Sequence, residues 1–233
     1  MKSRHLLIIA ALLIAGAGIF FILRSPPDET EETLSGRPQD PVGFEAPPDS
    51  PGWRPLFNGQ DLTGWSVTNF GPQGPVRVNN QAIILGFGDG CTGITWQRDF
   101  PTGDYEISLD AMRVAGNDFF CGLTFPVQDE FCSFIVGGWG GTVVGISSID
   151  GKDASENFTS TTRSFERQRW YHIRVRVTDR QLQTWIDGEQ MVEVPVEQHQ
   201  FSVRPEVRLS RPLGICAWRT SAALKNIRFR MLD

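Results

Sequence analysis

Residues 137–157 combine an aromatic side chain with a dense group of carboxylates, the most unusual pattern in the chain. Glycines surround Trp139, and Asp150, Asp153 and Glu156 place three acids within seven positions. A tryptophan offers a flat apolar face to a ring-shaped ligand such as a sugar, and carboxylates accept hydrogen bonds from hydroxyl groups. The same oxygens could hold Ca²⁺, although the spacing matches no complete calcium loop. The alternative is a solvated turn in which aspartate and serine cap backbone groups.

A second group of chemically active side chains lies at residues 113–118. Asp118 can act as a general base or pair with Arg113, whose guanidinium can stabilise a developing negative charge, and Asn117 can hydrogen-bond a polar ligand. The alternative is a plain Asn-Asp turn between strands. His172 is a further candidate base because imidazole titrates near neutral pH. A histidine on a strand face beside arginines is, however, more often a surface residue.

Other catalytic and metal-binding patterns are missing from the sequence. It shows no Ser-His-Asp arrangement, no glycine-rich phosphate loop before a helix and no HExxH motif. The four cysteines, Cys91, Cys121, Cys132 and Cys216, have no CxxC spacing, so no zinc or other metal site is predicted. Cys121 and Cys132 are the pair best placed for a disulfide, while buried free thiols are the alternative that we favour.

These residues need a scaffold, and the hydrophobic pattern predicts that it is built from strands. Apolar and polar residues alternate over 105–112 and 170–177, as in a strand with one core face and one wetter face. Asn79-Asn80 and Asp187-Gly188 each separate two such runs and predict hairpins. No stretch after residue 52 keeps a helical period for three turns. The pattern predicts an all-β domain of two stacked antiparallel sheets over residues 53–233.

The first 24 residues predict a transmembrane helix that anchors the chain. An uncharged run from Leu6 to Leu23 follows Lys2, Arg4 and His5, and as a helix it would span about 27 Å, close to the hydrocarbon thickness of a bilayer. The positive flank keeps the N-terminus in the cytoplasm. The rest of the chain is therefore expected outside the cytoplasm, in the periplasm or at the cell surface. A cleaved signal peptide is the alternative.

Residues 25–52 predict an acidic, proline-rich linker. They hold seven prolines and seven acids against a single arginine, so they cannot bury enough apolar surface to offset the entropy of ordering. Residues 53–233 carry 18 basic and 20 acidic residues. Because that balance is close to neutral, no nucleic-acid partner is predicted.

Three stretches of the β domain resemble a known family when they are taken together. They are an opening motif, a strand with the hairpin after it, and a closing strand: Leu56-Phe57-Asn58-Gly59-Gln60-Asp61-Leu62-Thr63-Gly64-Trp65, Arg169-Trp170-Tyr171 through Trp185-Ile186-Asp187-Gly188, and Ala223-Leu224-Lys225-Asn226-Ile227-Arg228-Phe229-Arg230. With these motifs the chain resembles the 3-keto-disaccharide hydrolase family over essentially all of residues 53–233. The resemblance implies a concanavalin A-like jelly-roll sandwich that handles carbohydrate.

The resemblance also implies a reaction. Members of the family act on a disaccharide or glycoside that is already oxidised at C3, where the ketone acidifies the hydrogen at C2. A base removes this hydrogen, the substituent at C1 leaves, and water adds to the product. The expected catalytic residues are Asp118, Glu156 and Arg113, and the expected substrate-binding residues are Trp139, Asp150, Asp153, Asn117 and His172.

Two other functions stay open because the chain departs from the family pattern. Where the family has Asn-Ser-Gly in a central strand followed by an arginine, this chain reads Asn117 to Phe125 without a basic residue at the end. The late Gln-x-His segment of the family is replaced by Cys216-Ala217-Trp218-Arg219. One alternative is a non-catalytic carbohydrate-binding module on a membrane tether, and another is a cell-envelope interaction domain. No cofactor is expected, with Ca²⁺ left open.

Overall fold

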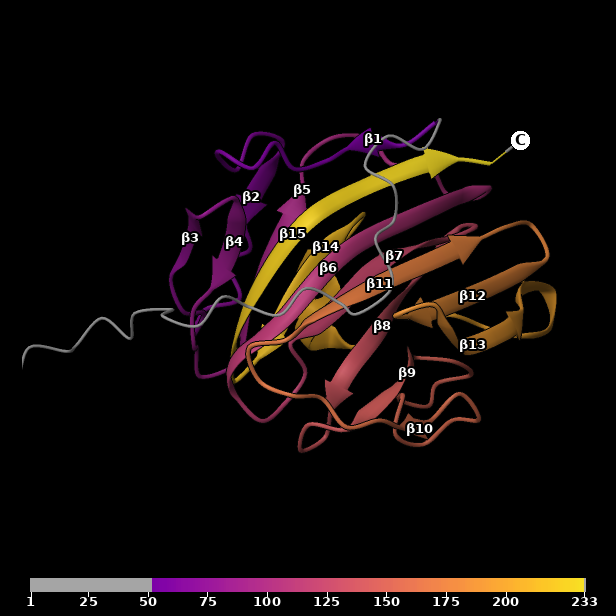
Figure 1. Cartoon of the computed structure of the whole chain (residues 1–233). Helices are drawn as coiled ribbons and strands as arrows, with labels where there is room; N and C mark the ends of the chain where they lie inside the picture. Colours follow the sequence, from indigo (N-terminus) through magenta and orange to yellow (C-terminus); the bar gives the residue numbers. More distant parts are fainter. Residues whose placement is uncertain (1–51, 233) are drawn as a thin grey trace, which may run out of the picture. The chain divides into compact units, whose positions relative to one another are not determined.

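The computed structural model describes residues 52–232, which form two stacked antiparallel sheets and two short 3-10 helices (Figure 1). The first sheet contains, in spatial order, β13 (Glu189–Pro195), β12 (Gln181–Ile186), β11 (Trp170–Val177), β6 (Tyr105–Gly116), β15 (Thr220–Met231), β4 (Ala82–Leu85) and β3 (Val76–Asn79), with β1 (Arg54–Pro55) paired to β15. The second sheet contains β10 (Thr161–Thr162), β9 (Val143–Ser147), β8 (Glu130–Gly138), β7 (Cys121–Val127), β14 (Gly214–Trp218), β5 (Cys91–Trp96) and β2 (Trp65–Val67). The helices are η1 (Val196–Gln198) and η2 (Pro205–Ser210). The predicted all-β sandwich of two antiparallel sheets is thus confirmed.

One hydrophobic core fills the space between the two sheets. Tyr105, Ile107 and Leu109 of β6 belong to the same buried cluster as Phe125 of β7 and Phe134 of β8, and all five are fully buried. Burying a large apolar side chain stabilises the fold by about 1.5–3 kcal/mol. Because strand side chains alternate, each inward position leaves its neighbour pointing outward, so the core also determines which residues the outer faces carry.

Both predicted hairpins are present. Asp187 and Gly188 join β12 to β13 with φ angles of 52° and 80°. The turn between β3 and β4 lies one residue later than predicted, because Asn79 ends β3 and the positive φ angles of 48° and 60° belong to Asn80 and Gln81. Two-residue hairpin turns need positive φ, which glycine and asparagine adopt at low cost.

The outer face of the first sheet corrects one prediction, because side chains expected to be wet are buried. Glu106 on β6 has no exposed surface. It accepts hydrogen bonds from Arg174 and Arg176 of β11 at 3.2 and 2.8 Å, and from Arg230 of β15 at 2.7 Å. The register places Glu106 directly between Arg176 and Arg230. The cross-strand pairing therefore supplies guanidinium groups where a solvated face was expected.

The four cysteines are buried free thiols. Cys121 and Cys132 lie on neighbouring strands, but Cys121 is opposite Val136 and Cys132 is opposite Phe125. The prediction of a disulfide between Cys121 and Cys132 is therefore wrong, and the favoured alternative of buried free thiols is confirmed. Burial raises the pKa of both the Cys121 and the Cys132 thiol, which keeps them protonated and unreactive.

The predicted transmembrane helix, residues 1–24, and all but the last residue of the predicted linker, residues 25–52, lie outside the described residues. Between residues 52 and 232, no helix has the length and apolar character needed to cross a bilayer. The predictions of an anchor and a linker therefore depend on the sequence alone.

The network around Glu106 predicts a large stability difference between two glutamates. Replacing Glu106 with alanine leaves three arginine side chains close together without their carboxylate, so we expect the free energy of unfolding to fall by about 3 kcal/mol. Glu189 is the control, because its side chain is 69% exposed where it pairs with Arg163. Glu189→Ala is expected to cost less than about 1 kcal/mol. Urea unfolding of both variants at pH 7 measures the difference, and equal losses would contradict the role assigned to Glu106.

Candidate functional site

A cavity of about 240 Å³ opens on the outer face of the second sheet. Its lining combines aromatic, small polar and charged side chains: Cys91, Asp118, Phe119, Ser133, Ile135, Trp139, Ser147, Arg204, Glu206, Val207 and Trp218. The outward positions of β7, β8 and β9 include the small residues Gly122, Ser133, Gly145 and Ser147, which alternate with large core residues. These small residues leave room above the sheet, so a ligand can approach its surface.

One wall of the cavity brings together two of the predicted site residues, Asp118 and Trp139. Asp118 follows β6, and its carboxylate accepts hydrogen bonds from the backbone N–H of Phe119 at 2.7 Å and of Gly140 at 3.5 Å. Trp139 sits at a φ of 46° in the turn after β8, and 42% of its surface is exposed. The contact to Gly140 thus joins the carboxylate to the turn that presents the indole.

Arg113 holds this turn in place from below. Its Nη2 donates hydrogen bonds to the carbonyl oxygens of Gly137 at 3.1 Å and Gly141 at 2.9 Å, and its guanidinium lies over the ring of Phe120. Burial lowers the pKa of Arg113 from its usual value. A Cβ on Gly137 would lie 2.4 Å from Nη2, so the close approach requires glycine. Arg113 therefore supports the Trp139 turn and does not line the cavity.

The opposite wall carries an ion-pair network that the sequence analysis did not identify. Arg204 donates to Glu206 through Nη2 at 3.0 Å and Nε at 3.3 Å, and its Nη1 donates to Asp153. The other oxygen of Asp153 accepts hydrogen bonds from the hydroxyls of Ser147 at 2.8 Å and Ser148 at 3.3 Å. Asp153 is thus placed beside the cavity, where it links β9 to Arg204.

The hydrogen bonds from Arg204 hold the pKa of Glu206 below its usual value and raise the pKa of Arg204. Both side chains stay charged near neutral pH, and a guanidinium is held at the cavity rim with both oxygens of Glu206 already engaged. Because Arg204 pairs with two carboxylates, Asp153 and Glu206, it can help an oxyanion on a ligand only through a guanidinium N–H that these two leave free.

Three other predicted residues lie away from the cavity lining. Asp150 is exposed and binds His199 Nδ1 at 2.8 Å and the backbone N–H of Gln200 at 2.9 Å. Glu156 and Asn117 are exposed, and neither is among the residues that line the cavity.

His172 lies on the outer face of the first sheet, on the other side of the sandwich from the cavity. Its Nδ1 contacts Asp110 at 2.7 Å, and its Nε2 contacts Ser108 at 3.2 Å. The structure thus forms a Ser-His-Asp set that the sequence did not reveal. Ser108 is only 1% exposed, and its strand is paired on both sides, so this set is a buried polar network and not an accessible nucleophile.

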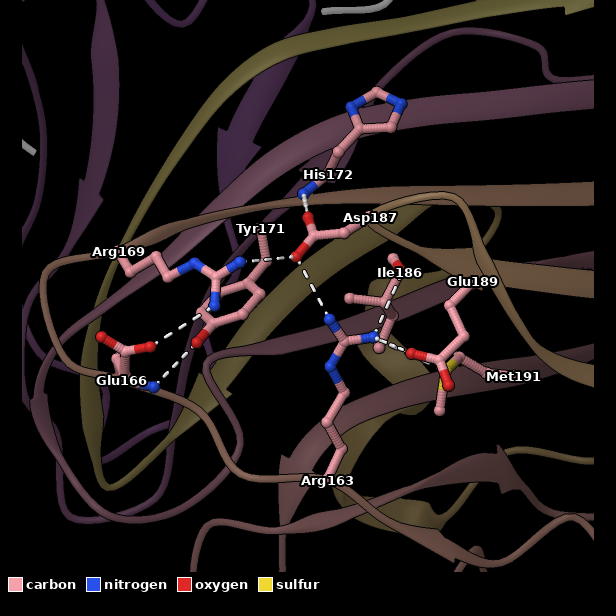
Figure 2. Close-up of polar contacts among 9 residues, drawn as sticks. All are labelled: Arg163, Glu166, Arg169, Tyr171, His172, Ile186, Asp187, Glu189 and Met191. Carbon is pink, nitrogen blue, oxygen red and sulfur yellow. Dashed lines mark hydrogen bonds and ion pairs between the residues drawn. The ribbon is translucent and has the colours of Figure 1, made fainter. Parts of the chain in front are cut away.

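Backbone contacts also fix His172. Figure 2 shows its N–H donating to Asp187 while its imidazole points away from that carboxylate. The same carboxylate pairs with Arg163 at 3.2 Å and Arg169 at 3.3 Å (Figure 2). Asp187 therefore ties the β12–β13 turn to β11 and to the segment that precedes β11.

The acids considered for Ca²⁺ do not converge. Asp150 turns to His199, whereas Asp153 turns to Ser147, Ser148 and Arg204. Within residues 52–232, no three His, Cys, Asp or Glu side chains gather in an arrangement that could hold a metal ion.

Several of the lining residues were not proposed from the sequence, among them Arg204, Glu206 and Trp218. Arg204 and Glu206 flank a proline in a polar stretch, and charge alone does not distinguish this pair from an ordinary surface pair. Trp218 is the outward residue at the end of β14, and its place in the cavity depends on the pairing of β14 with β7.

Most of the described domain matches a known protein family. Residues 52–230 match the family described as the 3-keto-alpha-glucoside-1,2-lyase-like domain. No curated protein matches the chain.

Solved structures share the fold at low sequence identity. A glycosyl hydrolase-like protein from Parabacteroides distasonis aligns with a TM-score of 0.53 at 16% identity, over 84% of this chain and 100% of its own. The carbohydrate-binding module CBM66 from Bacillus subtilis aligns with a TM-score of 0.50 at 13% identity, over 72% and 95%. The Crh5 transglycosylase, solved in complex with NAG, aligns with a TM-score of 0.55 at 14% identity, over 78% and 85%. At these identities the likeness concerns the fold alone.

The ion pair at the rim predicts a pH effect. The folded state lowers the pKa of Glu206, so its pairing with Arg204 stabilises the fold above the usual value of 4.5 and this stabilisation is lost as the pH falls through the lowered pKa. The effect is small because both side chains are more than 40% exposed. Arg204→Gln is expected to return the pKa of Glu206 toward 4.5, measured by a carboxyl NMR titration. Arg219→Gln, which removes an exposed pair with Asp89, is the control, and an unchanged Glu206 in Arg204→Gln would contradict the assignment.

Proposed function

The chain belongs to the 3-keto-alpha-glucoside-1,2-lyase-like domain family, and from this premise we propose that its cavity binds a 3-keto glycoside and eliminates the substituent at C1. The observation that carries the proposal is the lining of one cavity by a carboxylate, a guanidinium and two indoles. They belong to Asp118, Arg204, Trp139 and Trp218. Membership of this carbohydrate-active family supports a sugar as the ligand.

The cavity offers complementary surfaces for a sugar ring. Trp139 and Trp218 supply flat apolar faces on which the C–H groups of a pyranose can stack. The hydroxyls of Ser133 and Ser147 lie on the floor, where they can exchange hydrogen bonds with sugar hydroxyls. Ser147 is held by Asp153, so its position is set before a ligand arrives.

In the proposed reaction, Asp118 on one wall is the base and Arg204 on the opposite wall stabilises the enolate. Asp118 removes the proton from C2, and the electron pair left on C2 delocalises onto the C3 oxygen as an enolate, which accepts a hydrogen bond from a guanidinium N–H of Arg204 that Asp153 and Glu206 do not use. The enolate then collapses, a C1–C2 double bond forms, and the C1–O bond breaks with its electrons leaving on oxygen. The proton held by Asp118 passes to that oxygen. Water adds across the double bond to give the 3-keto sugar.

Asp118 is the better base of the two that the sequence proposed. It lines the cavity and accepts hydrogen bonds from backbone N–H groups, whereas Glu156 is exposed outside the lining. Glu206 also lines the cavity, but Arg204 occupies both of its oxygens. In this proposal Arg113 acts through the Trp139 turn, and Arg204 takes the charge-stabilising role first expected of Arg113.

A non-catalytic carbohydrate-binding module is the second candidate. It is favoured by the state of the two carboxylates in the cavity, because Glu206 is neutralised by Arg204 and only Asp118 is left to move a proton. The aromatic and hydroxyl groups would bind a sugar equally well without any reaction. Both candidates bind a sugar, but only the enzyme converts it to product.

The elimination proposal is tested with 3-keto-trehalose and ordinary trehalose. The full chain in detergent is expected to consume only the keto sugar, and Asp118→Asn is expected to lower kcat by at least about 100-fold, the size of a lost general base. Asp89→Asn, an exposed carboxylate outside the cavity lining, is the control. Glu156→Gln is the discriminating variant. If kcat falls in Glu156→Gln and not in Asp118→Asn, Glu156 is the base.

The remaining outcomes of that experiment are equally definite. Binding of both sugars without turnover would contradict the enzyme and support the binding module. The proposed steps use no metal, so EDTA is expected to leave the rate unchanged. A rate lost to EDTA and restored by Ca²⁺ would revive the calcium proposal for Asp150 and Asp153.

We further propose that the domain works outside the cytoplasm on a membrane tether. The support is the uncharged run Leu6 to Leu23 behind a positive flank, together with the acidic, proline-rich residues 25–52 as a spacer. This arrangement would present the cavity to glycans of the periplasm or the cell surface.

The tether predicts how the chain behaves on fractionation. In a bacterial host, the full chain is expected in the membrane pellet after washing at alkaline pH, with its C-terminal domain open to protease added from outside the cytoplasmic membrane. A variant that starts at residue 25 is the control and is expected in the soluble fraction. A full chain that washes off, or that external protease cannot reach, would contradict the proposal.

A further inference from the structure

An aromatic and a histidine side chain form a small surface patch beside the cavity. The rings of Phe158 and His199 stack with centroids 4.9 Å apart and an angle of 34° between their planes. Phe158 is 61% exposed, so one of its faces is supported by the imidazole while much of the ring is open to solvent. An exposed phenylalanine alone would be ordinary, and the supporting ring is what makes this one a defined platform.

The loop that carries Phe158 is held firmly. The neighbouring Asn157 is buried, and its Nδ2 donates to the carbonyl oxygens of Ile146 at 2.7 Å, Lys152 at 3.0 Å and Asp153 at 2.8 Å. Its Oδ1 accepts hydrogen bonds from the N–H and the hydroxyl of Thr159. Phe158 therefore projects from a rigid loop, and little entropy is lost when a ligand contacts it.

The histidine is held as firmly as the loop. His199 Nδ1 lies 2.8 Å from a carboxylate oxygen of Asp150, and the other oxygen accepts the N–H of Gln200 at 2.9 Å. These bonds lower the pKa of Asp150, the bond from Gln200 more than that from His199, so the carboxylate is ionised and can only accept. Nδ1 must then carry a proton, which leaves Nε2 as the ring nitrogen that can meet a ligand hydroxyl.

The platform and the cavity are two ends of one wall. Ser148 and Ser202 exchange backbone hydrogen bonds at 2.7 and 3.1 Å, and the N–H of Asp150 donates to Gln200 at 2.8 Å. This short ladder begins next to Ser147, which lines the cavity, and ends at Asp150 beneath His199. Three residues of chain span at most about 11 Å, so the cavity wall and the platform are close neighbours.

The platform also lies on the same side of the second sheet as the cavity. Gly145 occupies an outward position on β9, and a Cβ there would meet Ala154 and Thr159 of the loop at 3.1–3.2 Å. The loop therefore packs over the outer face of β9, beside the outward-facing Ser147. A chain of sugar rings that leaves the cavity along this wall would reach Phe158.

We propose that Phe158 and His199 form a second sugar-binding subsite that holds the ring joined to the one in the cavity. This inference rests on the proposed carbohydrate ligand of the cavity. Phe158 supplies a stacking face, and His199 Nε2 exchanges a hydrogen bond with a sugar hydroxyl. The substrate class is accordingly a disaccharide or longer glycoside, and a glycoside with a small alkyl group at C1 uses the cavity alone.

The test compares 3-keto-trehalose with methyl 3-keto-glucoside on the full chain. Phe158→Ala is expected to lower kcat/KM for the disaccharide about 3- to 10-fold, the size of one aromatic contact, and to leave the methyl glycoside unchanged. His199→Ala is expected to show the same selective loss. Phe87→Ala is the matched control, because Phe87 is 58% exposed and outside both the cavity lining and the platform.

The outcomes separate this inference from the proposed reaction. Equal losses on both substrates, or no loss on either, would overturn the subsite while leaving the elimination intact. If the wild-type chain turns over neither substrate, the proposed reaction is contradicted. The subsite is then tested by measuring the affinities for trehalose and methyl glucoside by calorimetry. A preference for the disaccharide that Phe158→Ala abolishes supports the subsite, and the absence of such a preference overturns it.

Discussion

Face-to-face packing of two antiparallel sheets is the constraint from which the rest of the domain follows. Phe125 and Phe134 must point inward to close the core, and the strand period of two then sends every second residue outward. On β7, β8 and β9 those outward residues include Gly122, Ser133 and Ser147, whose small size leaves room for the cavity above the sheet. On β11 and β15 they include Arg174, Arg176 and Arg230, which pair with the buried Glu106 of β6. One alternation thus produces a cavity on one side and a buried ion network on the other.

Two arginines shape the cavity by different means. Arg113 is buried below one wall and gives its hydrogen bonds to the carbonyl oxygens of the turn that presents Trp139. Arg204 is partly exposed in the opposite wall and joins Asp153 to Glu206. A guanidinium has several donors in one rigid plane, so a single side chain can hold two partners at fixed angles. The walls therefore stand in place before any ligand binds.

The two functions considered for the cavity share its recognition groups and differ in one requirement. In both, a sugar would be held by stacking on indole rings and by hydrogen bonds to its hydroxyls, whether or not it reacts. Elimination needs a carboxylate that can take a proton, and Asp118 meets that need because its contacts are backbone N–H groups and not a cation in direct contact. Membership of the lyase-like family supports the enzyme. The pairing of Glu206 with Arg204, which leaves one carboxylate to move a proton, supports the binding module.

Local patterns along the chain were enough to predict the all-β class, the hairpin at Asp187-Gly188, the family and two cavity residues, Asp118 and Trp139. This was possible because alternation, turn chemistry and family motifs are local properties of the chain. Only the tertiary structure decided that Arg204, Glu206 and Trp218 complete the cavity, that Arg113 supports a wall from below, and that His172 lies on the opposite face. Those results depend on which strands are neighbours and on which way each residue points, since β14 meets β7 across more than 80 residues of chain. A one-residue change of register would have turned Arg113, His172 and Trp218 to the other face of their sheets, and no local pattern records that register.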